Sequence, residues 1–190
     1  MDLDKAFALL AEHVSQPGLL KHCLSVEAAM RAYARKYGAD EELWGATGLL
    51  HDFDYEKYPV PDPAARTGHP FEGVKMLREQ GYPEEMTEAI LGHATYSGTP
   101  RTSQMAKCLY ACDELCGLVL ALAYVRPERF KGMDAASVEK AMKKKKFAEK
   151  VSREEIGQGI AELGVPREEH FRTVVEAMRG MQEELFPEAG

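Results

Sequence analysis

A histidine and an aspartate stand side by side at positions 51 and 52, directly after the apolar run from Gly48 to Leu50. Imidazole and carboxylate groups are both common ligands of divalent metal ions. Adjacent residues point roughly 100° apart around a helix, so both side chains reach one metal cluster most easily where the helix ends. The polar and proline-containing stretch after Asp52 predicts such an end. A single His-Asp pair can equally cap a helix, so the remaining histidines must decide between the two interpretations.

Four more candidate ligands stand on other expected helices or at their ends: His22, His69, His93 and Asp113. Asp113 lies among apolar residues, and a buried carboxylate is costly unless it is paired. Each histidine taken singly could be an ordinary hydrogen-bonded side chain, and for His13 and His170 that interpretation is retained. Together, the other histidines and Asp113 favour convergence on one metal site.

In this order the residues resemble the HD-domain metal-dependent phosphohydrolases (HDIG-like), whose pattern is a histidine, a later His-Asp pair and a distal aspartate. The resemblance covers roughly residues 19–125, and its residues here are His22, His51, Asp52 and Asp113. Members that hold two metal ions add two histidines between the pair and the last aspartate, where His69 and His93 stand. The resemblance implies that Asp52 bridges two ions, one also bound by His22, His51 and Asp113 and the other by His69 and His93. One or two ions of manganese, iron, magnesium or zinc would suit these ligands.

The resemblance also implies an activity, the cleavage of a small phosphate ester such as a nucleotide or related metabolite by a metal-activated water. Two alternatives stay open. Some HD-domain proteins with a similar ligand order are di-iron oxygenases, and a non-catalytic nucleotide-binding module would share the same residues. Asp54 and Glu56 follow the pair closely and are candidates to donate a proton or to orient water, although solvated loop carboxylates would look the same.

Basic residues cluster from Lys140 to Arg153, where seven lysines and arginines accompany one acid, Glu149. Most charge runs are solvated helix faces. The functional hypothesis is that part of the segment, represented by Lys143 and Lys144 of the run 143–146, folds back and neutralises substrate phosphate. Tyr96 and Arg101, on the loop after His93, are candidates to complete the same anion pocket.

The net charge of −7 over 190 residues argues against attraction to duplex nucleic acid or anionic membranes. The first fourteen residues lack the pattern of a signal peptide, and no apolar stretch approaches the roughly 20 residues of a membrane span. We therefore expect a cytoplasmic protein whose partner is a small phosphorylated substrate. The sequence leaves open whether the chain forms a homo-oligomer.

The elements that must position these side chains are all helical. Apolar residues recur at three-to-four spacing and no strand-like alternation appears, which predicts an all-α fold. We expect helices at about residues 2–14, 19–37, 40–50, 69–80, 83–94, 103–125, 135–145, 152–163 and 166–185. The shift to short charged helices after Gly132 suggests an HD-type metal-binding domain over residues 1–132 and a small C-terminal helical extension, residues 133–190, packed on it.

Two local patterns add detail. Ser152 and Glu155 have the spacing of a capping box at the start of a helix. Cys108, Cys112 and Cys116 recur every fourth residue, on one helix face, which does not suit disulfide or paired zinc-site geometry. With Cys23, they are predicted to be small buried hydrophobic side chains.

Overall fold

The computed structural model describes residues 3–187, and within that range ten α-helices and one short 3-10 helix form the fold. No strand occurs among these residues, and one isolated β-bridge joins Asp62 and Thr67. The predicted all-α fold is therefore confirmed. The helices are α1 (Leu3–His13), α2 (Pro17–Tyr37), α3 (Glu41–Leu50), α4 (Phe71–Glu79), α5 (Glu84–His93), η1 (Thr95–Ser97), α6 (Gln104–Tyr124), α7 (Ala135–Met142), α8 (Arg153–Leu163), α9 (Arg167–Gly180) and α10 (Gln182–Leu185).

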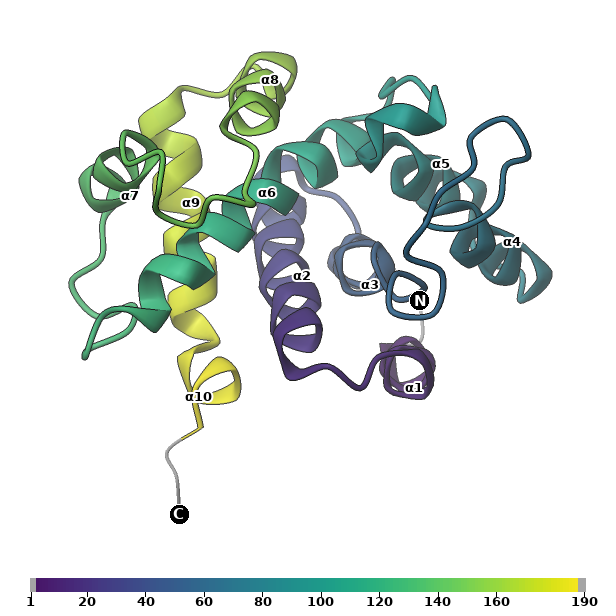
Figure 1. Cartoon of the computed structure of the whole chain (residues 1–190), viewed down its shortest axis with the longest axis horizontal. Helices are drawn as coiled ribbons and strands as arrows, with labels where there is room; N and C mark the ends of the chain where they lie inside the picture. Colours follow the sequence, from purple (N-terminus) through teal and green to yellow (C-terminus); the bar gives the residue numbers. More distant parts are fainter. Residues whose placement is uncertain (1–2, 188–190) are drawn as a thin grey trace.

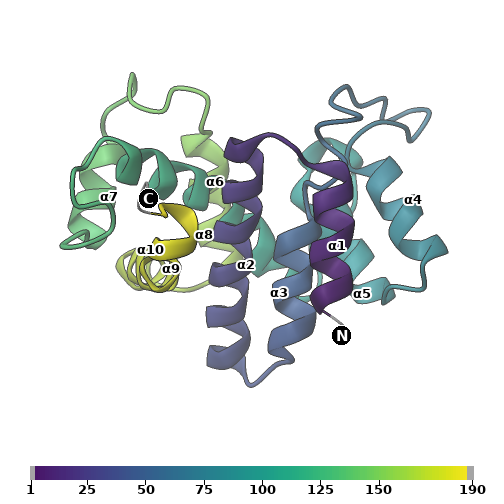
Figure 2. The same ribbon diagram turned by 90° about the horizontal axis from the view of Figure 1, so that it is seen from below.

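The two longest helices, α2 and α6, lie at the centre of the molecule (Figure 1). Helices α3 and α5 pack against them on one side, and α8 and α9 pack against them on the other. Seen from below, α1, α2 and α3 run alongside one another, with α9 and α10 beyond α2 (Figure 2). The buried apolar side chains of all these helices form one continuous core.

Capping residues fix the starts of several helices. The Asp40 carboxylate accepts hydrogen bonds from the backbone N–H groups of Glu42 and Leu43, at 2.9 and 3.0 Å, and so starts α3. The Ser103 hydroxyl similarly accepts from Ala106 N at the start of α6. These caps fix the start of the helix that directly precedes Asp52 and of the helix that carries Asp113.

Two glycines allow close helix approaches that matter for the site. A Cβ atom at Gly48 would lie 2.8 Å from the Val26 carbonyl oxygen, so α3 can approach the α2 backbone only because this position has no side chain. A Cβ at Gly159 would lie 2.7 Å from Ala111 Cα, which gives the same argument for α8 against α6. The close packing of α3 on α2, and of α8 on α6, therefore depends on glycine at these two positions.

Two predicted helix boundaries are wrong. Helix α7 ends at Met142 rather than near Lys145, because after Met142 the chain has no apolar side chain to pack before Phe147. The last predicted helix is divided into α9 and α10 at Met181, directly after Gly180, a residue with low helix propensity. Asp2, the predicted first helical residue, lies outside the described residues.

Helices α7–α10 contribute side chains to the same core as the helices before residue 132. His170 of α9 is fully buried: its Nε2–H donates to the Ala111 carbonyl of α6, at 3.0 Å, and its Nδ1 accepts from the Tyr33 hydroxyl of α2, at 2.6 Å. The C-terminal helices are thereby joined to the central pair by packing and by a buried polar contact. The domain boundary at residue 132 stays a prediction.

The four cysteines lie buried and free, as predicted. Burial raises the pKa of each thiol, that of Cys108 to about 12, so these side chains remain protonated and behave as small apolar groups. Of the described helices, none is both long and apolar enough to cross a membrane.

Candidate metal centre

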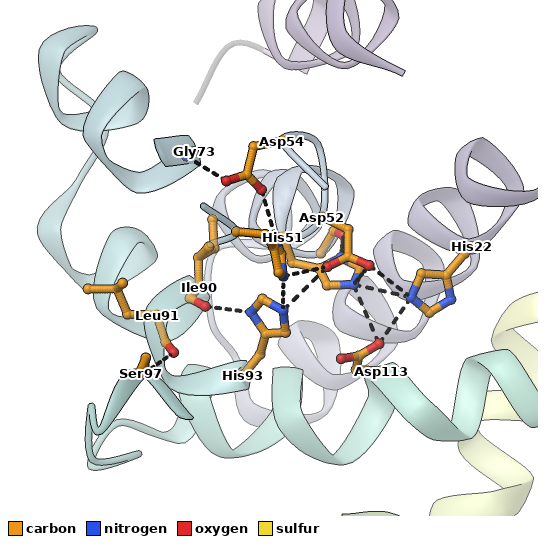
Figure 3. A network of polar contacts seen from close by, with 12 residues as sticks. His22, His51, Asp52, Asp54, Gly73, Ile90, Leu91, His93, Ser97 and Asp113 are labelled. Atoms are coloured by element: carbon orange, nitrogen blue, oxygen red, sulfur yellow. Dashed lines mark hydrogen bonds and ion pairs between the residues drawn. The ribbon is translucent and has the colours of Figure 1, made fainter. Parts of the chain in front are cut away.

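The structure brings the six candidate ligands together from five parts of the chain. His22 comes from α2, His93 is the last residue of α5, and Asp113 lies on α6. His51 and Asp52 directly follow α3, and His69 precedes α4. Figure 3 shows the labelled members of this cluster pointing toward one another across the space between these elements.

The first ligand group consists of His22, His51 and Asp113. His22 Nε2 lies 3.0 Å from Asp113 Oδ1 and 3.2 Å from His51 Nε2. His51 Nε2 lies 3.5 Å from the same Asp113 oxygen. Three ligand atoms on three different elements therefore surround one point.

The second group consists of His69, His93 and Asp52. The Nε2 atoms of His69 and His93 are 3.2 Å apart, and each lies 3.3 Å from Asp52 Oδ1. The other oxygen of Asp52, Oδ2, lies 3.4 Å from His51 Nε2 and 3.8 Å from His22 Nε2. Each oxygen of this one carboxylate thus faces a different pair of imidazoles.

The imidazoles are oriented by their second nitrogen. His51 Nδ1–H donates to the Gly48 carbonyl at 2.7 Å, and His93 Nδ1–H donates to the Ile90 carbonyl at 2.5 Å. A carbonyl can only accept a hydrogen bond, so in the neutral rings the unprotonated nitrogen is Nε2. Both lone pairs therefore point into the cluster, as metal ligation requires.

Asp54 supports His69 rather than facing the cavity. Its side chain is 1% exposed, its Oδ1 accepts from His69 Nδ1 at 2.6 Å, and its Oδ2 accepts from Gly73 N at 2.7 Å. The sequence hypothesis of a proton donor or water-orienting group at Asp54 does not fit this position, because both oxygens are engaged away from the cluster. Asp54 instead fixes the ring of His69 with Nε2 toward Asp52.

Glu56 also lies away from the cavity. Its carboxylate accepts hydrogen bonds from the backbone N–H groups of Ser15 and Gln16, at 2.9 and 3.0 Å, and from the Ser15 hydroxyl at 2.5 Å. These bonds, first that from the Ser15 hydroxyl, lower the pKa of Glu56. An ionised side chain that ties down the α1–α2 loop does not fit the hypothesis of a proton donor at Glu56.

The cluster stabilises positive charge. Burial alone would lower the pKa of His51, but the carboxylates of Asp52 and Asp113 outweigh burial and raise this pKa to about 9. Burial would likewise raise the pKa of Asp52, but His51, His93 and His69 outweigh it and hold the pKa well below its usual range. The two aspartates are therefore ionised and face only imidazoles within the cluster.

These contacts fit a divalent metal ion. Nδ1 of His93 donates to a carbonyl and Nδ1 of His69 faces a carboxylate, so in the neutral rings both Nε2 atoms present lone pairs to each other at 3.2 Å. Facing lone pairs repel unless a cation lies between them. Nitrogen and carboxylate donors suit manganese, iron, zinc and, less strongly, magnesium.

A cavity of about 370 Å³ opens over the cluster. Five of the six candidate ligands line it, all except His51, and Tyr96 lines it as well. The Tyr96 hydroxyl donates to the His69 carbonyl at 3.1 Å, and its side chain is 43% exposed. The residues that line the cavity are His22, Asp52, Tyr55, His69, His93, Ala94, Thr95, Tyr96, Asp113, Glu114, Gly117, Lys150, Val151 and Glu155.

Arg101 is absent from this lining because all sides of its guanidinium are engaged. It forms two parallel hydrogen bonds with the Glu162 carboxylate, at 2.6 and 2.7 Å, and donates to the Gly92 carbonyl at 2.8 Å. Its guanidinium also lies 3.7 Å from the centre of the Tyr110 ring. The predicted anion-pocket role does not fit a side chain that instead joins α5, α6 and α8.

The lysines at positions 143–146, including Lys143 and Lys144, are exposed on the outer surface and do not line the cavity. Another part of the same basic segment does reach it, through Lys150 and Val151. Arg153 holds this loop in place, donating to the carbonyls of Ala148 and Val151 at 2.5 and 2.8 Å. The segment therefore folds back as the sequence suggested, but with a different lysine.

Sequence reasoning missed Glu114, Lys150 and Glu155 as cavity residues. Burial, together with the charge of Asp113, raises the pKa of Glu114 to about 7. Position 114 directly follows a ligand on a helix and so projects from a neighbouring face, which is a signal the sequence offered. For Glu155, the capping-box pattern pointed to a purely structural role.

Among protein families, the model of the HD domain matches residues 19–118, a range that contains all six candidate ligands. No curated protein and no solved structure matches the chain.

Proposed function

The chain belongs to the HD-domain superfamily of metal-dependent phosphohydrolases, and from this premise we propose that it hydrolyses a small phosphate ester in the cavity over the ligand cluster. The observation that carries the proposal is the position of Asp52, whose two oxygens face two separate pairs of imidazoles at 3.3 to 3.8 Å. A carboxylate shared in this way is suited to two neighbouring cations, the arrangement that many phosphate-ester hydrolases use.

His22, His51 and Asp113 would hold one ion, His69 and His93 the other, and Asp52 both. When bound, the ions would neutralise phosphate oxygens and make a coordinated water more acidic. The first ion has one more protein ligand than the second. We therefore expect the His69–His93 position to bind its ion more weakly and to exchange it more readily.

The remaining residues of the site orient the ligand side chains or line the cavity. Asp54 holds the His69 ring, and the Gly48 and Ile90 carbonyls hold the rings of His51 and His93. Lys150 and Tyr96 both line the cavity and can contact a phosphate ester that enters from solvent. Because no cavity carboxylate other than Glu114 and Glu155 is free of the ligand cluster, a proton for the leaving oxygen would come from one of these two or from water.

The test is metal analysis of the purified full-length chain, followed by phosphate release from a panel of phosphate monoesters with Mn²⁺, Fe²⁺, Mg²⁺ or Zn²⁺. We expect up to two ions per chain and metal-dependent release that chelation abolishes. Oxygen consumption without phosphate release would favour the di-iron oxygenase, and nucleotide binding without metal or turnover would favour the binding module. Either result would contradict the proposal.

A further inference from the structure

The start of α8 contains an incomplete capping box. The Ser152 hydroxyl accepts from Glu155 N at 3.2 Å, as the motif requires. The reciprocal bond, from Ser152 N, goes instead to the carboxylate of Glu114 on α6, at 2.7 Å. Glu114 therefore takes the capping position that Glu155 would occupy within an isolated helix.

This exchange releases the Glu155 side chain. Its carboxylate makes no hydrogen bond or ion pair with any residue from 3 to 187, and it lines the cavity over the ligand cluster. Glu154, its neighbour on the first turn of α8, is exposed and does not line the cavity. One of two adjacent carboxylates thus faces the place where a ligand would bind.

The charges around the cavity limit what that ligand can be. Two divalent ions and Lys150 would supply five positive charges, and the four lining carboxylates, Asp52, Asp113, Glu114 and Glu155, would supply up to four negative ones. The difference is one positive charge, which the two negative charges of a phosphate dianion already exceed. Among residues 3–187, Lys150 is the one lysine or arginine in the lining, and the phosphate already exceeds the net positive charge that includes it. A second anionic group on the ligand would therefore meet Glu155 without a further cation, because the lysines at 143–146 and Arg101 are turned elsewhere.

We propose that Glu155 is a specificity-determining residue that accepts a hydrogen bond from an amino or hydroxyl group on the organic part of the substrate. The substrate is then a phosphate monoester with a neutral or cationic, N–H- or O–H-bearing organic group, and esters with a second anionic group are disfavoured. The proposal rests on the proposed function in one respect: a phosphate group occupies the metal end of the cavity.

Binding of two non-hydrolysable phosphonates of similar length tests the proposal independently of turnover. The Mn²⁺-loaded full-length protein is titrated calorimetrically with 2-aminoethylphosphonate and with 3-phosphonopropionate. We expect the amino compound to bind about tenfold more tightly, the effect of one charge-assisted hydrogen bond. Glu155→Gln should bring the ratio of the two dissociation constants close to one, whereas Glu154→Gln, with the same loss of charge on the same helical turn, should preserve it.

A ratio near one or reversed in the parent protein would overturn the proposal, as would an unchanged ratio in Glu155→Gln. If that variant unfolds, Glu155→Asp provides the second measurement, since its shorter carboxylate should weaken binding of the amino compound alone. Phosphate-ester turnover is measured separately on the same preparations. If the two dissociation constants differ as expected and Glu155→Gln removes the difference, but no phosphate ester is turned over, the selectivity of Glu155 is supported and the proposed hydrolysis is overturned. If phosphate esters are turned over but Glu155→Gln leaves the ratio of the dissociation constants unchanged, the hydrolysis is supported and the selectivity of Glu155 is overturned.

Discussion

Asp54 Oδ1 lies 2.6 Å from Nδ1 of His69, while Nε2 of the same ring lies 3.3 Å from Asp52 Oδ1. Two aspartates separated by one residue therefore contact opposite nitrogens of one imidazole. The turn that ends α3 gives them different tasks, one as a candidate ligand and one as the support that orients a ligand.

Asp54→Asn should weaken metal binding at the His69–His93 position by about 10- to 100-fold, because the amide cannot accept the imidazole proton as strongly as the carboxylate. Titration of metal content against free metal concentration measures this change. Glu56→Gln is the control: it should leave metal content unchanged and weaken only the contact with the α1–α2 loop. Equal metal loss in both variants would contradict the assignment of Asp54.

Gly73→Ala should reproduce the metal defect without touching a carboxylate. The added Cβ would lie 2.7 Å from Asp54 Cγ and 2.9 Å from Phe53 Cε1, so Asp54 must shift. We expect a loss of about 1–3 kcal/mol in unfolding free energy as well. Gly157→Ala in α8 meets nothing within 4 Å and should stabilise the chain by about 0.5–1 kcal/mol with unchanged metal content. Urea unfolding and metal analysis test both variants.

The ligand groups predict a graded response to substitution. His69→Ala and His93→Ala should lower the metal count toward one per chain, whereas Asp52→Ala should lose metal from both positions, since its oxygens face both groups. Metal analysis after equilibrium dialysis distinguishes these outcomes. A parent protein that binds a single ion at saturating metal would rule out the second position.

The two parts of the basic segment should behave differently. Lys150→Gln should raise the KM for a phosphate monoester about three- to fivefold, because Lys150 lines the cavity. Replacing all four lysines at 143–146 with glutamine should change KM less than about twofold, since they face solvent. Both are measured at low salt, where surface charges are least screened. A larger effect from the four surface lysines would assign the anion site to them.

Acid should destabilise the fold partly through His170. Burial lowers the pKa of His170 to about 4, while the unfolded residue titrates near 6.5. Between these values the unfolded state binds more protons, so the stability that neutral His170 provides above pH 6.5 is lost as the pH falls toward 4. At pH 5 the loss is about 2 kcal/mol. Between pH 7 and pH 5, the unfolding free energy of metal-free His170→Gln should therefore fall by about 2 kcal/mol less than that of the parent protein, as measured by urea unfolding. An equal fall in the two proteins would contradict the prediction.

The sequence by itself predicted the helical fold and the set of candidate ligands that the structure brings together. Apolar residues at three-to-four spacing bury one face when the chain is helical. The HD-domain family model matches residues 19–118, a range that contains His22, the His51-Asp52 pair and Asp113. Caps such as Asp40 and Ser103 could be predicted because they act within one turn of their own helix.

Only the tertiary structure decided what the neighbouring charged residues do. Asp54, Glu56 and Arg101 all looked available in the sequence, but partners 15 to 61 positions away engage them. Glu155 looked like a cap, yet Glu114, 38 positions from Ser152, took its hydrogen bond and left it facing the cavity. A charged side chain takes the best partner that the fold brings within reach, and that choice depends on distances between helices, which no local pattern contains.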